Sequence, residues 1–244
     1  YYYNNNMIEY DFRNGLNSPT LQGRVDYIYA DFRSKVPSDT KELKFVIGGY
    51  VDNSFDSLLK DINLGDLLSS LTHLEHLSMN GLHLKPYLQN YEYLGTIPTL
   101  KKLEINFIKF DISFLTQLTQ IEALKISIVE KKIPRVVLSL TQLKDLEIIN
   151  VRESIKLLPA EHNVLAVLTN LTKLKLETSN TDVSGLIRDS NLTGLTDLSL
   201  FQSKLGNKDL DLSSLVNLKK LNLSKVRGLG NLVLPTQIEE IYAE

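Results

Sequence analysis

Three histidines that lie close together in the sequence are the first residues that could hold a metal ion. His73, His76 and His83 accompany Glu75, and imidazole and carboxylate groups are common zinc ligands. Their spacing differs from the H-E-x-x-H of zinc hydrolases, which places both histidines on one face of a helix. We expect this cluster to straddle a strand, so that the histidines share no face. The sequence therefore predicts surface residues here and no metal site.

The sequence contains no complete signature of nucleotide binding or covalent catalysis. Gly228-Leu229-Gly230 follows a predicted strand, but a dinucleotide fingerprint also needs a third glycine and a helix after it. Neither a P-loop lysine motif nor a G-x-S-x-G nucleophile elbow occurs. Cysteine is absent, which excludes disulfides, thiolate zinc sites and thiol nucleophiles. We therefore predict a protein that is not an enzyme and has no cofactor.

Composition narrows the class of partner. The 244 residues carry a net charge of -2, which gives no global attraction to nucleic acid or to an anionic membrane. No apolar run approaches the roughly 20 residues that span a bilayer. The segment Tyr1–Asn6 has neither the basic nor the apolar region of a signal peptide. We expect the partner to be another protein, with no nucleic acid and no membrane insertion.

An apolar frame recurs eight times along the chain, and seven copies follow L-x-x-L-x-x-L-x-L, with isoleucine or methionine at some positions. Equivalent positions lie 20–28 residues apart, and the last copy, Pro235 to Ala243, is degenerate. The third apolar residues of the eight copies are Leu77, Leu103, Leu124, Leu146, Leu174, Leu198, Leu221 and Ile241. A repeat of this period predicts a solenoid in which neighbouring units share one core.

This repeat resembles the leucine-rich repeat family over about residues 40–244. The resemblance implies an α/β solenoid, with a curved parallel sheet on the concave face and short helices, 3₁₀ turns and extended segments on the convex face. The family consensus places Asn or Cys three residues after the fourth apolar position. Here that position holds Leu82, Ile108, Val129, Val151, Ser179, Ser203 and Val226. We therefore expect a divergent subfamily without an asparagine ladder, whose turn backbone bonds to water, to other backbone or to the two serines.

The repeat also sets the expected domain organisation. Residues 37–244 are predicted to form one continuous array of about nine repeats, the first of them at Leu43. Residues 1–36 are predicted to be an N-terminal cap made of strands, because Met7–Phe12 and Val25–Phe32 alternate apolar and polar residues. An array needs such a cap to cover its first repeat. At the other end we expect a partner or further chain to cover the last strand.

Alternation along each strand places one row of side chains outward, and strand stacking aligns these rows into columns. One column runs Glu104, Lys125, Glu147, Lys175 and so alternates in sign. The column two residues earlier alternates in the same way from Asp145 to Glu240. Two interpretations remain open: the charges prevent repulsion between strands, or they form a docking surface that gives specificity.

Outward apolar residues are the stronger indication of a partner, because interface anchors are often apolar or aromatic. We expect Phe201, Ile149 and Val46 to face solvent, with Phe107 and Ile128 just beyond. Phe201 and Tyr242 form the preferred anchor pair. The candidate partner-binding residues are Phe201, Tyr242, Ile149, Asn106, Lys125, Glu147, Lys175 and Asn222.

These features favour a non-catalytic protein–protein interaction module that binds through its concave face, as a scaffold or receptor subunit of an assembly in the cytoplasm or nucleus. A first alternative is a secreted or surface-exposed bacterial adhesin or effector, because the phrase from Leu168 to Leu174 resembles internalin repeats. A second is a fragment of a larger enzyme or of a ubiquitin-ligase substrate receptor.

Overall fold

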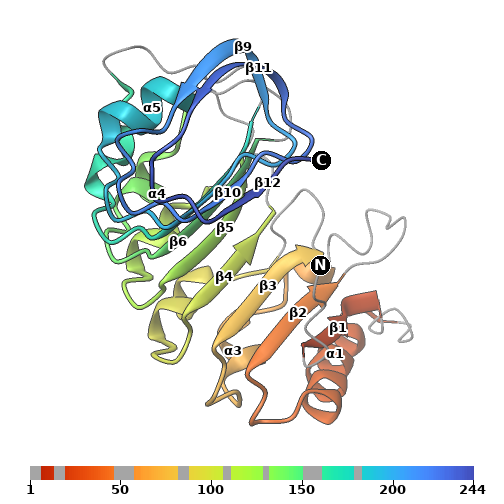
Figure 1. Cartoon of the computed structure of the whole chain (residues 1–244). Helices are drawn as coiled ribbons and strands as arrows, with labels where there is room; N and C mark the ends of the chain where they lie inside the picture. Colours follow the sequence, from red (N-terminus) through yellow and green to blue (C-terminus); the bar gives the residue numbers. More distant parts are fainter. Residues whose placement is uncertain are drawn as a thin grey trace. The chain divides into compact units, whose positions relative to one another are not determined.

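The computed structural model describes residues 7–13, 20–46, 58–81, 88–106, 111–128, 132–150, 161–178 and 183–244. The chain divides into two compact units, Tyr1–Ile121 and Glu122–Glu244. Each unit contains parallel strands joined by short helices and turns (Figure 1). The units are described one after the other.

The strands of the first unit lie parallel and in sequence order. They are β1 (Ile8–Asp11), β2 (Glu42–Val46), β3 (His76–Gly81) and β4 (Lys102–Ile105). Leu43 pairs with Leu77, and Leu77 pairs with Leu103, so the third apolar position of each repeat stands beside that of the next. All three leucines are fully buried. The register that the repeat predicts is confirmed in this unit.

The predicted strand over Val25–Phe32 is wrong, because this segment lies within a helix, α1 (Leu21–Lys35). The hydroxyl of Thr20 accepts a hydrogen bond from the Gly23 amide at 3.0 Å and caps the helix. The buried residues Val25, Ile28 and Phe32 are three and four residues apart, which is helical spacing. Tyr27 counts as an apolar residue in the alternating pattern, but in the structure it is exposed. The pattern therefore does not follow the buried face of this segment.

Aromatic packing fixes α1 against the first strands. The ring of Phe32 lies edge-on to that of Tyr10 at 4.9 Å between centroids, and Phe12 meets Phe45 in the same manner at 5.0 Å. The Tyr10 hydroxyl also donates to the main-chain oxygen of Ile28 at 3.2 Å. These contacts join α1, β1 and β2 in one aromatic cluster, and the cap over residues 1–36 stays a prediction.

Short helical segments return the chain between the strands of the first unit. They are α3 (Leu64–Leu68), η2 (Tyr91–Thr96) and η3 (Ser113–Gln117), where η denotes a 3₁₀ helix. The side chain of Asn63 caps α3 by accepting from the Gly65 amide at 2.8 Å. Each segment buries leucine against the core, such as Leu67 in α3 and Leu94 in η2.

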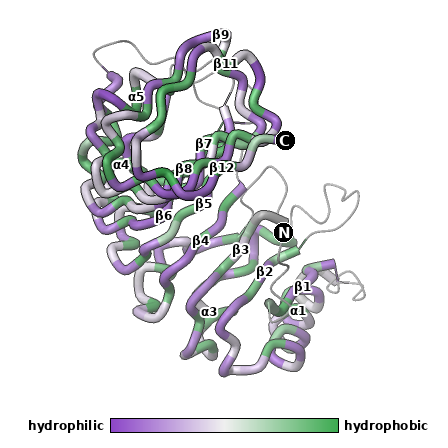
Figure 2. Tube along the Cα trace, viewed as in Figure 1, coloured by the Kyte–Doolittle hydropathy of each residue, from purple (hydrophilic) through white to green (hydrophobic). Residues whose placement is uncertain are grey.

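The second unit continues the same plan with six parallel strands in order. They are β5 (Ala123–Ile128), β6 (Asp145–Asn150), β7 (Lys173–Glu177), β8 (Asp197–Ser199), β10 (Lys220–Asn222) and β12 (Glu240–Tyr242). Leu174 pairs with Leu146 on one side and Leu198 on the other, and the register continues to Ile241. Figure 2 shows hydrophobic and hydrophilic residues alternating along these strands. The leucines are buried, whereas Ile241 is 46% exposed.

The return segments of this unit are more varied. They are α4 (Arg135–Leu138), η5 (Val164–Val167), α5 (Val183–Ser190) and a second parallel sheet of β9 (Lys204–Asp211) with β11 (Arg227–Val233). Figure 1 shows β9 and β11 on the other side of the coil from β10 and β12. Repeats of different length therefore share one strand register but close their turns differently.

Side-chain hydrogen bonds join successive turns, although the consensus asparagine is missing. Ser203, which is fully buried at one consensus position, donates to the Leu176 oxygen at 2.8 Å and accepts from the Thr178 amide at 3.0 Å. A second column lies before the strands, where a polar side chain of one repeat donates to a carbonyl of the repeat before it. Its members are Thr99 to Leu74, Gln120 to Leu94, Asn170 to Thr141, Asn217 to Thr193 and Gln237 to Leu215.

Candidate functional site

A groove of about 320 Å³ crosses the outward face of the sheet in the second unit. We call it the sheet groove. Its polar and aromatic lining residues are Asp145, Glu147, Lys173, Lys175, Asp197, Ser199, Lys220, Asn222 and Tyr242. They come from β6, β7, β8, β10 and β12, so five strands contribute to one surface.

Strand alternation places these side chains outward. Lys173 and Lys175 flank buried Leu174 in β7, and the same alternation holds around buried Leu198 and Leu221 in the next strands. Lys175 pairs with Ser199, Ser199 with Asn222, and Asn222 with Tyr242. The structure thus brings four predicted residues into the groove: Glu147, Lys175, Asn222 and Tyr242.

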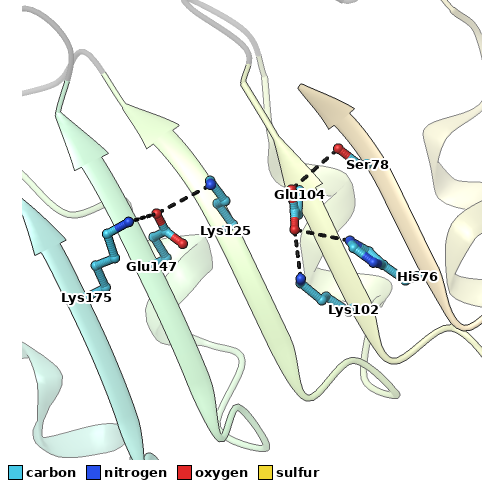
Figure 3. Close-up of polar contacts among 7 residues, drawn as sticks. All are labelled: His76, Ser78, Lys102, Glu104, Lys125, Glu147 and Lys175. Atoms are coloured by element: carbon cyan, nitrogen blue, oxygen red, sulfur yellow. Dashed lines mark hydrogen bonds and ion pairs between the residues drawn. The ribbon is translucent and has the colours of Figure 1, made fainter. Parts of the chain in front are cut away.

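The alternating charges of the groove form ion pairs across neighbouring strands. Glu147 accepts from the Lys175 ammonium at 2.7 Å and lies 3.4 Å from that of Lys125 (Figure 3). Lys220 and Glu240 form another such pair at 2.9 Å. Cross-strand pairs of this kind contribute roughly 0.2–1 kcal/mol each. These cross-strand ion pairs are the contacts that the structural interpretation of the charge column predicts.

Lys173 differs from the other groove lysines. It is exposed and forms no ion pair with any residue in the described ranges, although Asp145 and Asp197 flank it in the register. Asp197 instead accepts a hydrogen bond from the Thr196 hydroxyl at 2.6 Å. The sequence showed that charge alternates along the column from Asp145 to Glu240, to which Lys173 belongs, but none of its members was among the candidate partner-binding residues. The signal that identifies Lys173 is its lack of an ion-pair partner among the described residues, which only the structure shows.

The other predicted residues of the second unit lie outside the groove. The Phe201 ring is partly exposed, with the Lys175 ammonium 5.6 Å and the Lys225 ammonium 5.3 Å from its centroid. Ile149 is partly exposed on β6 and stands in register with Glu177. Of the expected anchor pair, Tyr242 lines the groove, whereas Phe201 lies beside the groove residue Lys175.

Three further apolar residues were expected on or just beyond the outward face of the strands. Val46 is partly exposed, as expected. Ile128 is 2% exposed, so it does not lie on the outward face; the strand alternation that buries Leu124 and Ile126 also places Ile128 inward. Phe107 lies outside the described residues.

In the first unit, polar contacts gather on Glu104 of β4. Its carboxylate contacts His76 Nε2 at 3.1 Å, Lys102 Nζ at 2.8 Å and Ser78 Oγ at 3.4 Å (Figure 3). Burial by itself would raise the pKa of Glu104, but hydrogen bonds from His76 and Lys102 outweigh it and lower that pKa to about 2. Glu104 is therefore a carboxylate at all physiological pH values.

Asn106, another predicted residue of the first unit, follows β4 and is partly exposed. Its side-chain oxygen is buried and accepts no hydrogen bond from the described residues. A buried oxygen of this kind is usually satisfied by water or by a partner group.

The histidines do not converge on a metal site. His76 contacts Glu104, whereas His73 Nδ1 contacts the hydroxyl of its neighbour Thr72 at 3.0 Å. His83 lies outside the described residues. Within the described ranges, no three metal-ligating side chains come together.

Ser190, His162 and Asp189 are the one serine–histidine–aspartate set that we find close together among the described residues. The Ser190 hydroxyl donates to the main-chain oxygen of His162 at 2.9 Å, and His162 Nδ1 lies 3.4 Å from Asp189. General-base catalysis needs the serine hydroxyl to donate to the imidazole ring. The hydrogen bond to the backbone directs it elsewhere, so this set does not form a nucleophile relay.

No helix in the described ranges combines the length and the apolar character needed to cross a bilayer. No protein-family profile and no curated protein matches the sequence.

Solved structures with a similar arrangement come from several organisms. An internalin, inlF, of Listeria monocytogenes is 20% identical with a TM-score of 0.46, over 85% of this chain and 63% of that one. InlP of the same organism is 19% identical with a TM-score of 0.47, over 84% of this chain and 53% of that one. The leucine-rich-repeat ectodomain of the Arabidopsis receptor kinase HAESA is 15% identical with a TM-score of 0.44, over 83% of this chain and 38% of that one.

The assignment of the chain rests on its own residues. Equivalent apolar positions recur every 20–28 residues, and the structure stands them side by side in parallel strands with short helical returns. The expected α/β architecture is confirmed in each unit. With this repeat in its sequence and this register in its strands, each unit has the fold of a leucine-rich-repeat solenoid.

Proposed function

We propose that the protein is a non-catalytic interaction module that binds a partner protein through the sheet groove. The observation that carries the proposal is the groove itself: about 320 Å³, lined from five strands by side chains that the buried leucine frame does not dictate. A scaffold or receptor subunit of a larger assembly would use such a surface.

Two features of the groove support a protein as the ligand. Both signs of charge line it, which suits a polar protein surface better than a uniformly charged polymer. Tyr242 is 52% exposed at one end and offers a flat amphipathic ring, a side chain that recurs among interface hot spots. Lys173 adds a positive charge without an ion-pair partner among the described residues.

Strand pairing also supports binding by a preformed surface. The groove residues stand on hydrogen-bonded strands in continuous register, so little conformational entropy remains to be lost on association.

The place of action is part of the proposal. The absence of cysteine supports an intracellular assembly, since the end caps of secreted eukaryotic repeat proteins are commonly disulfide-bonded. The internalin-like phrase from Leu168 to Leu174 supports the second candidate, a secreted or surface-exposed bacterial protein.

The test combines affinity capture with variants of the groove. The full chain, Lys173→Glu and Tyr242→Ala are used to capture proteins from a lysate of the source organism, and the best-enriched protein is then purified for a direct measurement of Kd. We expect each variant to weaken binding at least about fivefold, because an interface charge or aromatic anchor contributes about 1 kcal/mol or more.

Matched controls lie away from the groove. Lys60→Glu makes the same charge change at an exposed site of the first unit, and Val216→Ala truncates another exposed apolar side chain of the second unit. The proposal would be wrong if groove variants and controls bound the purified partner equally.

A further inference from the structure

A second pocket of the same unit has a different character from the sheet groove and shares no lining residue with it. This pocket, of about 480 Å³, is lined by Glu177, Gln202, Lys204, Lys225, Val226 and Arg227. We call it the basic pocket. It forms where β7 ends and where β9 and β11 begin. Three of its six side chains are cationic and one is anionic.

The cations of the basic pocket have no anionic partners among the residues that the structure describes. Lys204, Lys225 and Arg227 are exposed, and none forms an ion pair with any residue that the structure describes. In the sheet groove, by contrast, Lys175 and Lys220 are paired with glutamates at 2.7 and 2.9 Å. A net charge of -2 for the whole chain does not explain a local excess of positive charge. The pocket therefore presents a positive potential to solvent.

The backbone that carries these side chains is held firmly. The Lys204 amide donates to the Thr178 oxygen at 2.9 Å, and the Arg227 amide donates to the Ser203 oxygen at 2.9 Å, so one turn is bonded to the next. Buried Ser203 adds two further bonds between the same turns. A rigid backbone fixes the directions of the charged side chains, which lowers the entropic cost of binding.

Lys225 occupies a conformation that favours glycine. Its φ is 58°, and the equivalent residue of the preceding repeat, Gln202, has a φ of 60°. Side chains are disfavoured in this left-handed region, and residues held there often serve a function. The Lys225 ammonium lies 5.3 Å from the centre of the Phe201 ring, a cation–π contact that positions the charge. A long cationic side chain thus stands where glycine would fit with less strain.

We propose that the basic pocket binds an acidic segment of a partner protein. The guanidinium of Arg227 can hold a carboxylate through two parallel hydrogen bonds, and the two lysines supply point charges beside it. A peptide fits better than a nucleic acid, because a base would need a free aromatic ring to stack on. The Phe201 ring is already occupied, since the ammonium groups of Lys175 and Lys225 both lie within 6 Å of its centre. Glu177 limits the affinity by repelling the ligand.

The experiment measures binding of a fluorescein-labelled decaglutamate peptide to the full chain by fluorescence anisotropy, at low and at high salt. Lys225→Gly removes the charge and also relieves the left-handed φ, so we expect a thermal midpoint that is unchanged or higher together with at least about fivefold weaker binding. Arg227→Glu should weaken binding as much or more. Glu177→Gln should strengthen it, and high salt should weaken every interaction.

Three controls separate this pocket from general charge effects. Lys60→Glu makes a comparable charge change at an exposed site of the first unit and should bind decaglutamate within about twofold of the unmodified chain. Labelled decalysine and a single-stranded decauridylate replace the peptide. The proposal is overturned if decaglutamate does not bind, if Lys225→Gly and Arg227→Glu bind it as well as Lys60→Glu does, or if decauridylate binds more tightly. Because the sheet groove is tested with its own variants and its own captured partner, either proposal can fail without the other.

Discussion

The same outward position of the repeat holds Glu104 in one strand and Glu147 in another, and the two carboxylates have different surroundings. Glu147 faces lysines of the strands on either side. Glu104 contacts a histidine and a serine of the neighbouring strand β3 and a lysine of its own strand β4. Its side chain is 16% exposed. Residue type and repeat position predicted charge at both sites, but not which groups would neutralise it.

Replacing Glu104 should lower the free energy of unfolding by an amount that depends on pH. The pKa of Glu104 is lowered from the ordinary 4.5 to about 2 in the folded chain. The carboxylate therefore contributes fully to the free energy of unfolding above the unfolded-state pKa of 4.5, and this contribution is lost as the pH falls from 4.5 towards 2. We expect Glu104→Gln to reduce the free energy of unfolding by about 1–3 kcal/mol at neutral pH. The difference from the unmodified chain should vanish near pH 2, as measured by urea unfolding across this range.

Glu92→Gln is the control for this prediction, because Glu92 is an exposed carboxylate of the same unit. It should change stability little at any pH. A deficit in Glu104→Gln that stayed constant down to pH 2 would show that the hydrogen-bonded carboxylate does not carry the effect.

At the scale of elements, the turns are tied together without the family's asparagine. Ser203 supplies the hydrogen bonds at one consensus position, and a column of threonine and amide side chains before the strands supplies others. The sequence predicted that serine could serve at the consensus position, and this is confirmed for Ser203. The second column was not predicted, because its donors vary between threonine, glutamine and asparagine and show no single repeated letter.

Ser203→Ala should leave the Thr178 amide and the Leu176 carbonyl without their side-chain partner in a buried site. An unsatisfied buried group costs about 1–3 kcal/mol, so we expect a loss of this size in the free energy of unfolding. Ser214→Ala is the matched control, since the Ser214 hydroxyl is buried and has no hydrogen-bond partner within the described part of the chain. It should be neutral or slightly stabilising. Equal losses for both variants in urea unfolding would contradict this account.

At the scale of the whole molecule, stability comes from a core that neighbouring repeats share. In every repeat from Leu43 to Leu221, the residue at the third apolar position is at most 2% exposed. The exception is Ile241 in the last strand, at 46%. The frame assigns all of them the same role, but the number of neighbouring strands decides how much each one contributes.

Leu174→Ala and Ile241→Ala therefore form an informative pair, because both remove apolar atoms from the same repeat position. Leu174 is 2% exposed between two strands, so its truncation should cost about 2–5 kcal/mol. Ile241 is 46% exposed, and its truncation should cost less than about 1 kcal/mol. Thermal and urea unfolding measure both. Similar losses would mean that exposure in the structure does not set the contribution of this position.

The sequence by itself determined the strands of the leucine repeats, their parallel order and their register, because each repeat carries its own inward leucines and a two-residue alternation fixes which side chains face out. Tertiary structure decided the rest. A short apolar alternation suits a strand or a helix, and in the structure Val25–Phe32 is a helix whose Phe32 packs against Tyr10. Cross-strand ion pairs such as Glu147–Lys175, and the grouping of Lys204 with Lys225 and Arg227 in the basic pocket, bring together side chains of different repeats. Their contacts follow from how repeats stack and turn, which no local pattern encodes.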